Sequence, residues 1–442
     1  MRHVIVGGDA AGMTAAGRIR GAAPDDEVVV FEVGRFTSYS ACGIPFVIGG
    51  KVAGGVEALV ARPPDEHRAR GIDVRMNHEV TAVDTAKGEV EYLDHHAGTT
   101  SRLGYDRLLL ATGGEPIRPD LPGIGLPMIH GVQTLEDAER LVGLAEEACR
   151  RVVVVGGGYI GLEMAEAYIE RGCSATIVEQ DAQPLGLFDA DFGQRAADAM
   201  TAKGIDVRSK VEVKGFEPGK VVTSDGDLEA DLVVLGIGVR PRSVLARDAG
   251  IELGAAGAIH VDDHQATTTA GVWSAGDCAE SHHLLTGRPV HIALGTYANR
   301  HGRVAGVNMA GGDARSPGVL GTAVTKLCTL ELALTGLTEG KAVDAGFDAM
   351  AVTIESTTHA GYLPDAAPMT VRLTVERGSG RLLGGQIVGG PGAAKRIDIV
   401  ATAITAGMTV AEVADLDLAY APPFSSVWDP VAQAAIEAIK AV

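Results

Sequence analysis

A strand, a glycine-rich turn, a helix and a second strand that ends in a glutamate occur twice along this chain. The first copy covers residues 3–32, with the turn Gly7-Gly8-Asp9-Ala10-Ala11-Gly12. The second copy covers residues 151–179, with the turn Gly156-Gly157-Gly158-Tyr159-Ile160-Gly161. This arrangement predicts two β-α-β units with parallel strands, each able to bind a dinucleotide.

The glycines are needed because such a turn is tight and its backbone must approach a pyrophosphate at a helix N-terminus. Glu32 follows Gly12 by 20 positions, and Glu179 follows Gly161 by 18. At this spacing each glutamate can accept hydrogen bonds from a ribose 2′-hydroxyl. The alternative is that the glycines serve packing alone, and the presence of a second loop argues against it.

The two loops differ in ways that bear on their ligands. Asp9 stands where the middle glycine of the first loop belongs, and we do not expect its carboxylate to face the pyrophosphate. Glu179 would repel a 2′-phosphate, and the following segment Gln180-Asp181-Ala182-Gln183 has no basic residue to hold one. The second loop therefore favours NADH over NADPH.

Cys42 lies between the two loops, in the segment Thr37-Ser38-Tyr39-Ser40-Ala41-Cys42-Gly43-Ile44-Pro45-Phe46. A reactive cysteine needs a source of electrons, and a flavin bound by the first loop can supply them. A dithiol enzyme would carry a second cysteine a few residues away, and none is present. We therefore expect Cys42 to pair with a foreign sulfur or to oxidise to a sulfenic acid. The alternative is a buried structural thiol.

Composition narrows the class of protein. The chain has 442 residues, 46% of them hydrophobic, and a formal net charge of -19, so nucleic acid and anionic membranes are unlikely partners. The five cysteines are widely spaced, which argues against a disulfide framework and against zinc. A strand starts at the N-terminus and no apolar run is long enough to span a bilayer, so we expect a cytoplasmic enzyme.

The rest of the chain predicts the domain organisation. A strand at 107–110 ends in Ala111-Thr112-Gly113-Gly114, and one at 272–274 ends in Ala275-Gly276-Asp277. From about residue 321 alternating apolar and polar residues predict an antiparallel sheet, followed by two helices. The fold class is therefore α/β, with two Rossmann-like domains and a C-terminal α+β domain. The predicted boundaries are 1–112 with 240–316, then 113–239, and then 317–442.

These motifs resemble those of the flavoprotein disulfide reductases that bind two dinucleotides, the pyridine nucleotide-disulfide oxidoreductases, over nearly the whole chain. The absence of a second cysteine makes the single-cysteine branch most similar. The first loop, the cysteine segment and the C-terminal segments 418–425 and 427–430 are similar to those of coenzyme A disulfide reductases. Segment 359–364 resembles their HxxYYP motif, although Leu363 replaces the second tyrosine.

The resemblance implies FAD in the first domain, NADH in the second, and dimerisation through the third. The cofactor-binding residues that the loops and the resemblance imply are Gly7, Gly8, Ala10, Ala11, Gly12, Glu32, Val80, Ala111, Thr112, Gly113, Gly156, Gly158, Tyr159, Ile160, Gly161, Glu163, Glu179, Gly238, Gly276, Asp277 and Ala298. Among these, Asp277 would hydrogen-bond the FAD ribityl chain and Tyr159 would act as a lid over the flavin.

The resemblance also implies a mechanism. Cys42 would rest as a mixed disulfide with coenzyme A, and a flavin and a helix N-terminus would lower its pKa. Tyr420, helped by Tyr362, would protonate the departing thiolate. Both tyrosines would come from the partner subunit of a homodimer. Coenzyme A would lie along Thr14, Arg18, Ser38, Asn299 and Trp428. Arg62, Arg68 and Arg70 are further candidates for its phosphates, and no metal site is expected.

Several alternatives remain open at this point. The same cysteine can serve a reductase of polysulfide or coenzyme A persulfide, or an oxygen-reducing NADH oxidase. Two further alternatives are not disulfide-reducing enzymes: a redox-sensing flavoprotein that turns over slowly, and a binding protein without flavin. Cys149, Cys173 and Cys278 are expected to be inert core thiols, and Cys328 less firmly so.

The choice of nicotinamide cofactor is testable. Replacing Glu179→Ala together with Gln180→Arg removes the repulsion of a 2′-phosphate and adds a cation to bind it, so we expect the preference to shift toward NADPH. The measurement is the ratio of kcat/KM with NADH to kcat/KM with NADPH. An unchanged ratio would contradict the assignment of Glu179.

Overall fold

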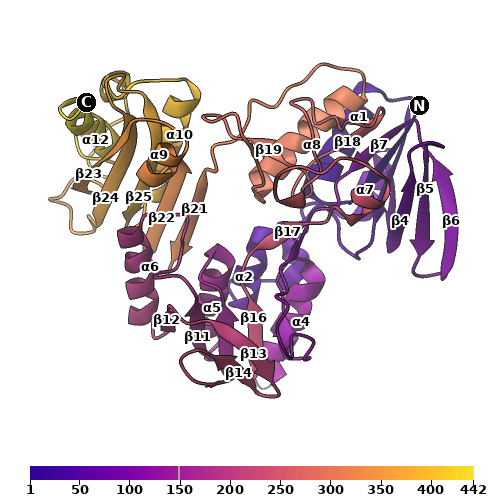
Figure 1. The fold of residues 1–442 in the computed structure, drawn as a ribbon, viewed down its shortest axis with the longest axis horizontal. Helices are drawn as coiled ribbons and strands as arrows, with labels where there is room; N and C mark the ends of the chain where they lie inside the picture. The colour runs from indigo at the N-terminus through magenta and orange to yellow at the C-terminus, as the bar shows by residue number, and fades with distance from the viewer. Residues whose placement is uncertain (148–149) are drawn as a thin grey trace.

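A computed structural model describes residues 1–147 and 150–442 of the chain. Figure 1 shows three parts: the first at the N-terminal end, the second below the centre, and the third at the C-terminal end on the opposite side. The predicted fold class, two α/β domains and a C-terminal domain with an antiparallel sheet, is confirmed. Cys149, expected to be an inert thiol, lies outside the described residues. None of the helices in the described ranges combines the length and apolar character that crossing a bilayer requires.

The first domain is built on a parallel sheet. Its strands, in spatial order, are β18 (Val272–Ser274), β7 (Arg107–Leu110), β1 (Arg2–Val6), β2 (Glu27–Glu32) and β3 (Asp73–Met76). The inner strands are apolar and buried on both faces, as a parallel sheet covered on both sides requires. Because β18 comes from far along the chain, this sheet joins segments on either side of the second domain.

Different layers cover the two faces of that sheet. Ile5 faces helices α1 (Ala10–Ala22) and α8 (Gly295–Met309), whereas its neighbours on β1 pack against a three-stranded antiparallel sheet. The strands of that sheet are β4 (His78–Asp84), β5 (Glu89–Asp94) and β6 (Thr99–Gly104). The sequence did not predict this layer, because its strands are short, charged and half exposed.

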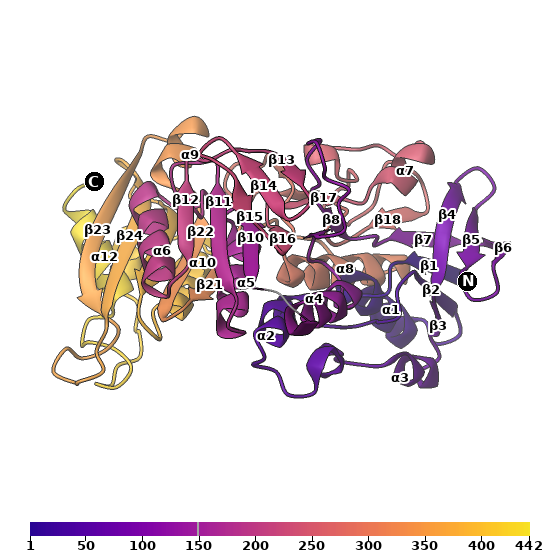
Figure 2. The same cartoon turned by 90° about the horizontal axis from the view of Figure 1, so that it is seen from below.

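Helices α1 and α8 approach closely, and glycine makes the approach possible. A Cβ atom at Gly302 would lie 2.2 Å from the carbonyl oxygen of Ala11, and one at Gly306 would lie 2.7 Å from that of Ala15. Any side chain there would force the helices apart. The tight packing, which can be followed in Figure 2, brings residues of α8 beside the first glycine loop.

The second domain repeats the architecture of the first. Its parallel sheet has the order β12 (Asp206–Ser209), β11 (Ser174–Glu179), β10 (Arg151–Val155), β16 (Leu232–Leu235) and β9 (Ile129–His130). The main helices around it are α4 (Leu135–Glu147), α5 (Tyr159–Glu170) and α6 (Ala190–Ala202). A small antiparallel sheet of β13 (Val213–Glu217), β14 (Lys220–Thr223) and β15 (Leu228–Glu229) packs beside it, and β8 (Gly114–Pro116) pairs with β17 (Val239–Pro241) where the chain enters and leaves.

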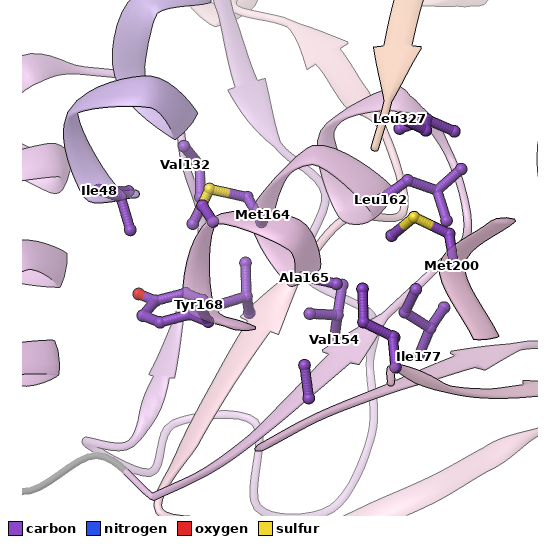
Figure 3. Packing of buried hydrophobic residues seen from close by; sticks show 14 of the residues in the cluster. Ile48, Val132, Val154, Leu162, Met164, Ala165, Tyr168, Ile177, Met200 and Leu327 are labelled. Atoms are coloured by element: carbon purple, nitrogen blue, oxygen red, sulfur yellow. The ribbon is translucent and has the colours of Figure 1, made fainter. Parts of the chain in front are cut away.

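The core of the second domain extends into its neighbours. Figure 3 shows Met164 and Tyr168 of α5 packed in a cluster that also includes Ile48 of helix α2 (Ile44–Ile48) and Leu327 of strand β21 (Ala323–Leu327). Helix α2 follows directly after Cys42, so the cysteine segment is anchored by burial in this core. The apolar cluster therefore fixes the cysteine segment against the second domain.

The third domain is an antiparallel sheet with helices on it. The sheet order is β21 (Ala323–Leu327), β22 (Leu330–Gly336), β25 (Leu382–Gly389), β24 (Pro368–Glu376) and β23 (Ala349–Thr357). Its helices are α9 (Glu339–Asp344), α10 (Ile397–Thr405), α11 (Val410–Ala414) and α12 (Pro430–Ile439). Four of the strands and two of the helices were predicted, whereas strand β22 was not.

Candidate functional site: two dinucleotide loops and a single cysteine

The two glycine loops have the same backbone geometry. Gly7 and Gly156 adopt φ values of +109° and +102°, which side chains rarely tolerate. A Cβ atom at Gly12 would lie 1.9 Å from the carbonyl oxygen of Gly7, and one at Gly161 would lie 2.1 Å from that of Gly156. Each loop therefore needs glycine at its first and last positions, as the sequence predicts.

The two glutamates also take the same place in their units. Glu32 accepts hydrogen bonds from the N–H groups of Gly8 and Gly34, both at 2.7 Å. Glu179 accepts them from Gly157 at 2.6 Å and Asp181 at 2.8 Å. Each carboxylate is thus fixed beside its loop with acceptor capacity left for ribose hydroxyls. Burial raises the pKa of Glu32, and the two N–H donors oppose that rise.

The other residues assigned to the first dinucleotide lie around the carboxyl ends of the strands. Thr112 donates a hydrogen bond to the carbonyl of Arg242 at 2.6 Å. Gly276 has φ +83°, and Ala298 packs against it. Burial raises the pKa of Asp277, whose carboxyl group is therefore suited to bond a ligand hydroxyl. Val80 is placed differently: its side chain is buried in the apolar cluster under β1 and β2.

Around the second loop, Gly158 is the N-cap of α5 and Gly238 has φ +98°. The hydroxyl of Tyr159 is buried and has no hydrogen-bond partner within the described residues. Burial also raises the pKa of Tyr159. Glu163 accepts a hydrogen bond from Thr325 of the third domain at 2.8 Å, and burial raises the pKa of this carboxyl group. An orphaned buried hydroxyl beside the glycine loop fits a bound nicotinamide dinucleotide.

Cys42 lies in the 3₁₀ turn η1 (Ala41–Gly43), and its side chain is exposed. Packing still removes enough water from the thiol to raise its pKa, and the carboxylates of Glu163 and Asp277 raise it further. The sequence predicts that a bound flavin and a helix N-terminus together lower this pKa, and for the flavin-bound protein this stays a prediction. The helix that follows, α2, has only five residues, so its dipole is small.

Four of the five residues assigned to the substrate form two groups on the first domain. Thr14 donates to the side-chain oxygen of Asn299 at 2.8 Å, where α1 meets α8, and Arg18 is exposed one turn further along α1. Ser38 bonds the ring nitrogen Nε2 of His67 at 2.9 Å.

Beyond His67 lies a pocket of about 170 Å³ that is rich in basic groups. Its charged and titratable residues are Arg20, Arg62, His67 and Arg70. Burial and the charges of Arg62 and Arg70 lower the pKa of His67. Arg68, a candidate in the sequence, instead donates to the carbonyl of Val74 and to Asp65 and does not line the pocket. His67 and Arg20 were missed, because only folding brings their elements together.

The third domain carries the two tyrosines assigned to the partner subunit and also the substrate residue Trp428. Trp428, Tyr362 and Tyr420 are 58%, 75% and 48% exposed. Phe424 and Val427 beside them are equally exposed. Within the described part of one chain, no hydrogen bond or ring contact joins either tyrosine to Cys42. An exposed aromatic surface of this kind is typical of an interface.

Among the remaining cysteines, Cys173 and Cys278 are buried, and Cys328 is half-buried in a turn at φ +58°. Burial and the nearby Glu166 raise the pKa of Cys328. No cluster of three or more His, Cys, Asp or Glu side chains suited to a metal ion occurs within residues 1–147 and 150–442.

Comparison with known proteins shows relatives of similar length along nearly the whole chain. The chain is 37% identical to the NAD(P)H sulfur oxidoreductase (CoA-dependent) of Pyrococcus furiosus over 97% of both chains. It is 35% identical to an NADH oxidase of Methanocaldococcus jannaschii, covering 100% of this chain and 99% of the other. It is 29% identical to a coenzyme A disulfide reductase of Staphylococcus aureus over 96% of both chains.

A solved structure of the reduced CoADR-RHD of Bacillus anthracis superimposes with a TM-score of 0.97 and 32% identity, covering 99% of this chain and 80% of that one. The family model of the pyridine nucleotide-disulphide oxidoreductases matches residues 1–302, and the model of their dimerisation domain matches residues 322–432. The chain therefore belongs to the pyridine nucleotide-disulphide oxidoreductase family, whose members are oxidoreductases that use FAD and NAD(P)H.

Proposed function

We propose that this enzyme passes electrons from NADH through FAD to Cys42 and on to coenzyme A disulfide or a related low-molecular-weight disulfide. The observation that carries the proposal is one exposed cysteine in the segment between two dinucleotide loops, with a basic pocket whose His67 bonds Ser38 of the same segment. FAD would accept a hydride and supply electron pairs to sulfur. The first loop and Glu32 would hold it, and the second loop and Glu179 would hold NADH.

The chemistry at Cys42 is thiol–disulfide exchange. The thiolate attacks one sulfur of coenzyme A disulfide, the S–S bond breaks, and one coenzyme A thiolate leaves while a mixed disulfide forms. Two electrons originating from NADH then cleave the mixed disulfide and release the second coenzyme A. NADH, one proton and one disulfide are consumed, and NAD⁺ and two thiols are produced. A cytoplasmic setting, where thiols are kept reduced, suits this reaction.

Tyr420 and Tyr362 would supply the proton that each departing thiolate takes up. Their hydroxyls are exposed on the third domain, and the presence of a dimerisation domain supports delivery from a partner subunit. The active unit would then be a homodimer, with Trp428 of the partner completing the substrate site. Tyr362 stands alone in its segment, because Leu363 takes the place of a second tyrosine.

The basic pocket argues for coenzyme A as the carrier of the sulfur. The chain has a net charge of -19, so an anionic ligand needs a local cluster of cations. Arg20, Arg62 and Arg70 form such a cluster next to His67, which in turn contacts Ser38. Guanidinium groups bind phosphates with paired hydrogen bonds. We therefore place the phosphates of coenzyme A in this pocket and its thiol end at Cys42.

A second candidate function is reduction of polysulfide or coenzyme A persulfide through the same cysteine. The relative with 37% identity is named as a CoA-dependent sulfur oxidoreductase, which favours this candidate. Coenzyme A would then remain bound as a carrier of sulfur. A third candidate, oxygen reduction, draws support from the relative named NADH oxidase.

Anaerobic NADH consumption distinguishes the two sulfur substrates. We expect fast consumption with coenzyme A disulfide in the wild type and none in Cys42→Ser, because serine cannot form the mixed disulfide. The measurement is the fall in NADH absorbance with coenzyme A disulfide or with polysulfide. Slow consumption with the disulfide and fast consumption with polysulfide would move the function to sulfur reduction.

The pocket can be tested separately from the cysteine. In Arg62→Gln we expect KM for coenzyme A disulfide to rise about 10-fold, the order expected for losing a hydrogen bond to a charged group. KM for NADH should stay unchanged. Arg68→Gln is the matched control, since Arg68 does not line the pocket. Equal KM values for coenzyme A disulfide in the two variants would show that the pocket does not bind coenzyme A.

The proposed role of Tyr420 as the proton donor is tested by Tyr420→Phe. We expect NADH to reduce Cys42 as in the wild type, but turnover with coenzyme A disulfide to slow by at least about 10-fold, because the proton donor is lost. Stopped-flow flavin absorbance reports the first step, and steady-state kcat reports the second. Tyr105→Phe, which removes a core hydroxyl, is the control. Wild-type turnover in Tyr420→Phe would exclude this residue as the acid.

The electrostatics of Cys42 predict a dependence on pH. Glu163 is the carboxylate that most strongly raises the pKa of Cys42, so Glu163→Gln should lower that pKa and move thiolate formation to lower pH. The measurement is the pH profile of Cys42 alkylation by iodoacetamide without NADH. Glu170→Gln, the same change on the same helix, should leave the profile in place. A shift to higher pH in Glu163→Gln would contradict the sign.

A further inference from the structure

The internal repeat continues beyond the glutamates into the loops that follow them. The carbonyl of Gly8 accepts a hydrogen bond from the N–H of Ser38 at 3.2 Å, and that of Gly157 accepts one from Leu185 at 2.9 Å. Ser38 and Leu185 both adopt left-handed backbone conformations, with φ of +51° and +55°. The first unit can therefore be compared position by position with the second.

One position differs between the two units in a way that concerns Cys42. Asp9 is the N-cap of α1, and Gly158 is the N-cap of α5. An aspartate at an N-cap usually accepts a hydrogen bond from the N–H of the second or third residue of its helix, and the side chain of Asp9 makes no such capping bond. Its Oδ1 instead accepts a hydrogen bond from the N–H of Tyr39 at 2.9 Å. The second unit has no side chain at Gly158 that can make this contact.

The bond from Asp9 adds to two others on the same segment. The hydroxyl of Thr37 and the N–H of Ser38 both donate to the carbonyl of Gly8. On its other side the segment pairs with residues 59–60, through an N–H of Ser40 and the bridge from Tyr39 to Val60. Cys42 follows three residues after Tyr39, so these contacts fix the chain on which the cysteine lies.

The charged form of the Asp9 carboxyl group is disfavoured at this position, because the group is largely removed from water. Burial, with smaller contributions from the charges of Glu32 and Asp277, raises the pKa of Asp9 to about 6. A glycine, which the second unit carries, would avoid that cost. A buried carboxylate kept against such desolvation, and bonded to the cysteine segment, indicates a role in holding that segment.

We propose that Asp9 is a positioning residue for Cys42, which holds the cysteine segment against the first dinucleotide loop through the Tyr39 N–H. The importance of Cys42 rests on the proposed function, but the structural effect of Asp9 does not. Because Asp9 lies in the loop that binds the dinucleotide, it couples the geometry of the loop to that of the cysteine.

The test compares Asp9→Asn, whose amide oxygen can still accept from Tyr39, with Asp9→Ala, which cannot. Asp25→Ala, at an exposed aspartate beyond the far end of α1, is the control. In the FAD-loaded protein we expect hydrogen exchange of the peptide that contains Tyr39 to be about 5-fold faster in Asp9→Ala, as expected for losing one hydrogen bond. Asp9→Asn and Asp25→Ala should exchange as the wild type does.

A second readout completes the test. In FAD-loaded Asp9→Ala we expect the rate of Cys42 alkylation to change, whereas FAD-loaded Asp9→Asn should be alkylated at the wild-type rate. Wild-type exchange in Asp9→Ala would overturn the proposal. Equal exchange and equal alkylation in Asp9→Asn and Asp9→Ala would overturn it too, since charge and not the hydrogen bond would then matter. If coenzyme A disulfide proves not to be a substrate, the exchange and alkylation results still decide the role of Asp9.

Discussion

The hydrogen bond from a glycine N–H to the glutamate at the end of the neighbouring strand is the contact on which the site depends. It occurs at Gly8 with Glu32 and again at Gly157 with Glu179. In each unit it places a carboxylate, a helix N-terminus and a tight glycine turn within one small region. A dinucleotide needs all three at once, the helix end for its pyrophosphate and the acid for its ribose.

The cysteine takes its environment from that arrangement and from the second domain. Desolvation by burial raises the pKa of Cys42 most, and the carboxylates of Glu163, Asp277 and Asp9 raise it further. The chain by itself therefore favours the thiol over the thiolate. The apolar cluster that buries α2 holds the segment rigid from the other side. The reactivity of Cys42 then depends on how the charges of the bound cofactor and substrate shift its pKa, and less on the dipole of helix α2.

The sequence predicted those features that depend on local geometry. Gly7, Gly12 and Glu32 could be assigned because a tight turn and a carboxylate at a strand end each demand a residue type at a fixed spacing. Strand β22 was missed, since Leu-Glu-Leu-Ala-Leu-Thr-Gly contains strong helix formers and is held in a sheet by its neighbours. Arg68 bonds the carbonyl of Val74 and does not line the basic pocket, whereas His67, which lines it, was overlooked. The direction of a side chain on α3 (Pro64–Ala69) depends on such tertiary contacts.

The left-handed residues Ser38 and Leu185 occupy equivalent positions in two loops whose following residues make different contacts. Four residues after Ser38 the chain carries Cys42, and four residues after Leu185 it carries Asp189. Asp189 accepts hydrogen bonds from Arg372 and Gln386, both at 2.7 Å, and so ties the second domain to the third. The same loop geometry thus presents a single exposed thiol in the first unit, whereas in the second unit it presents a carboxylate that fastens one domain to the next.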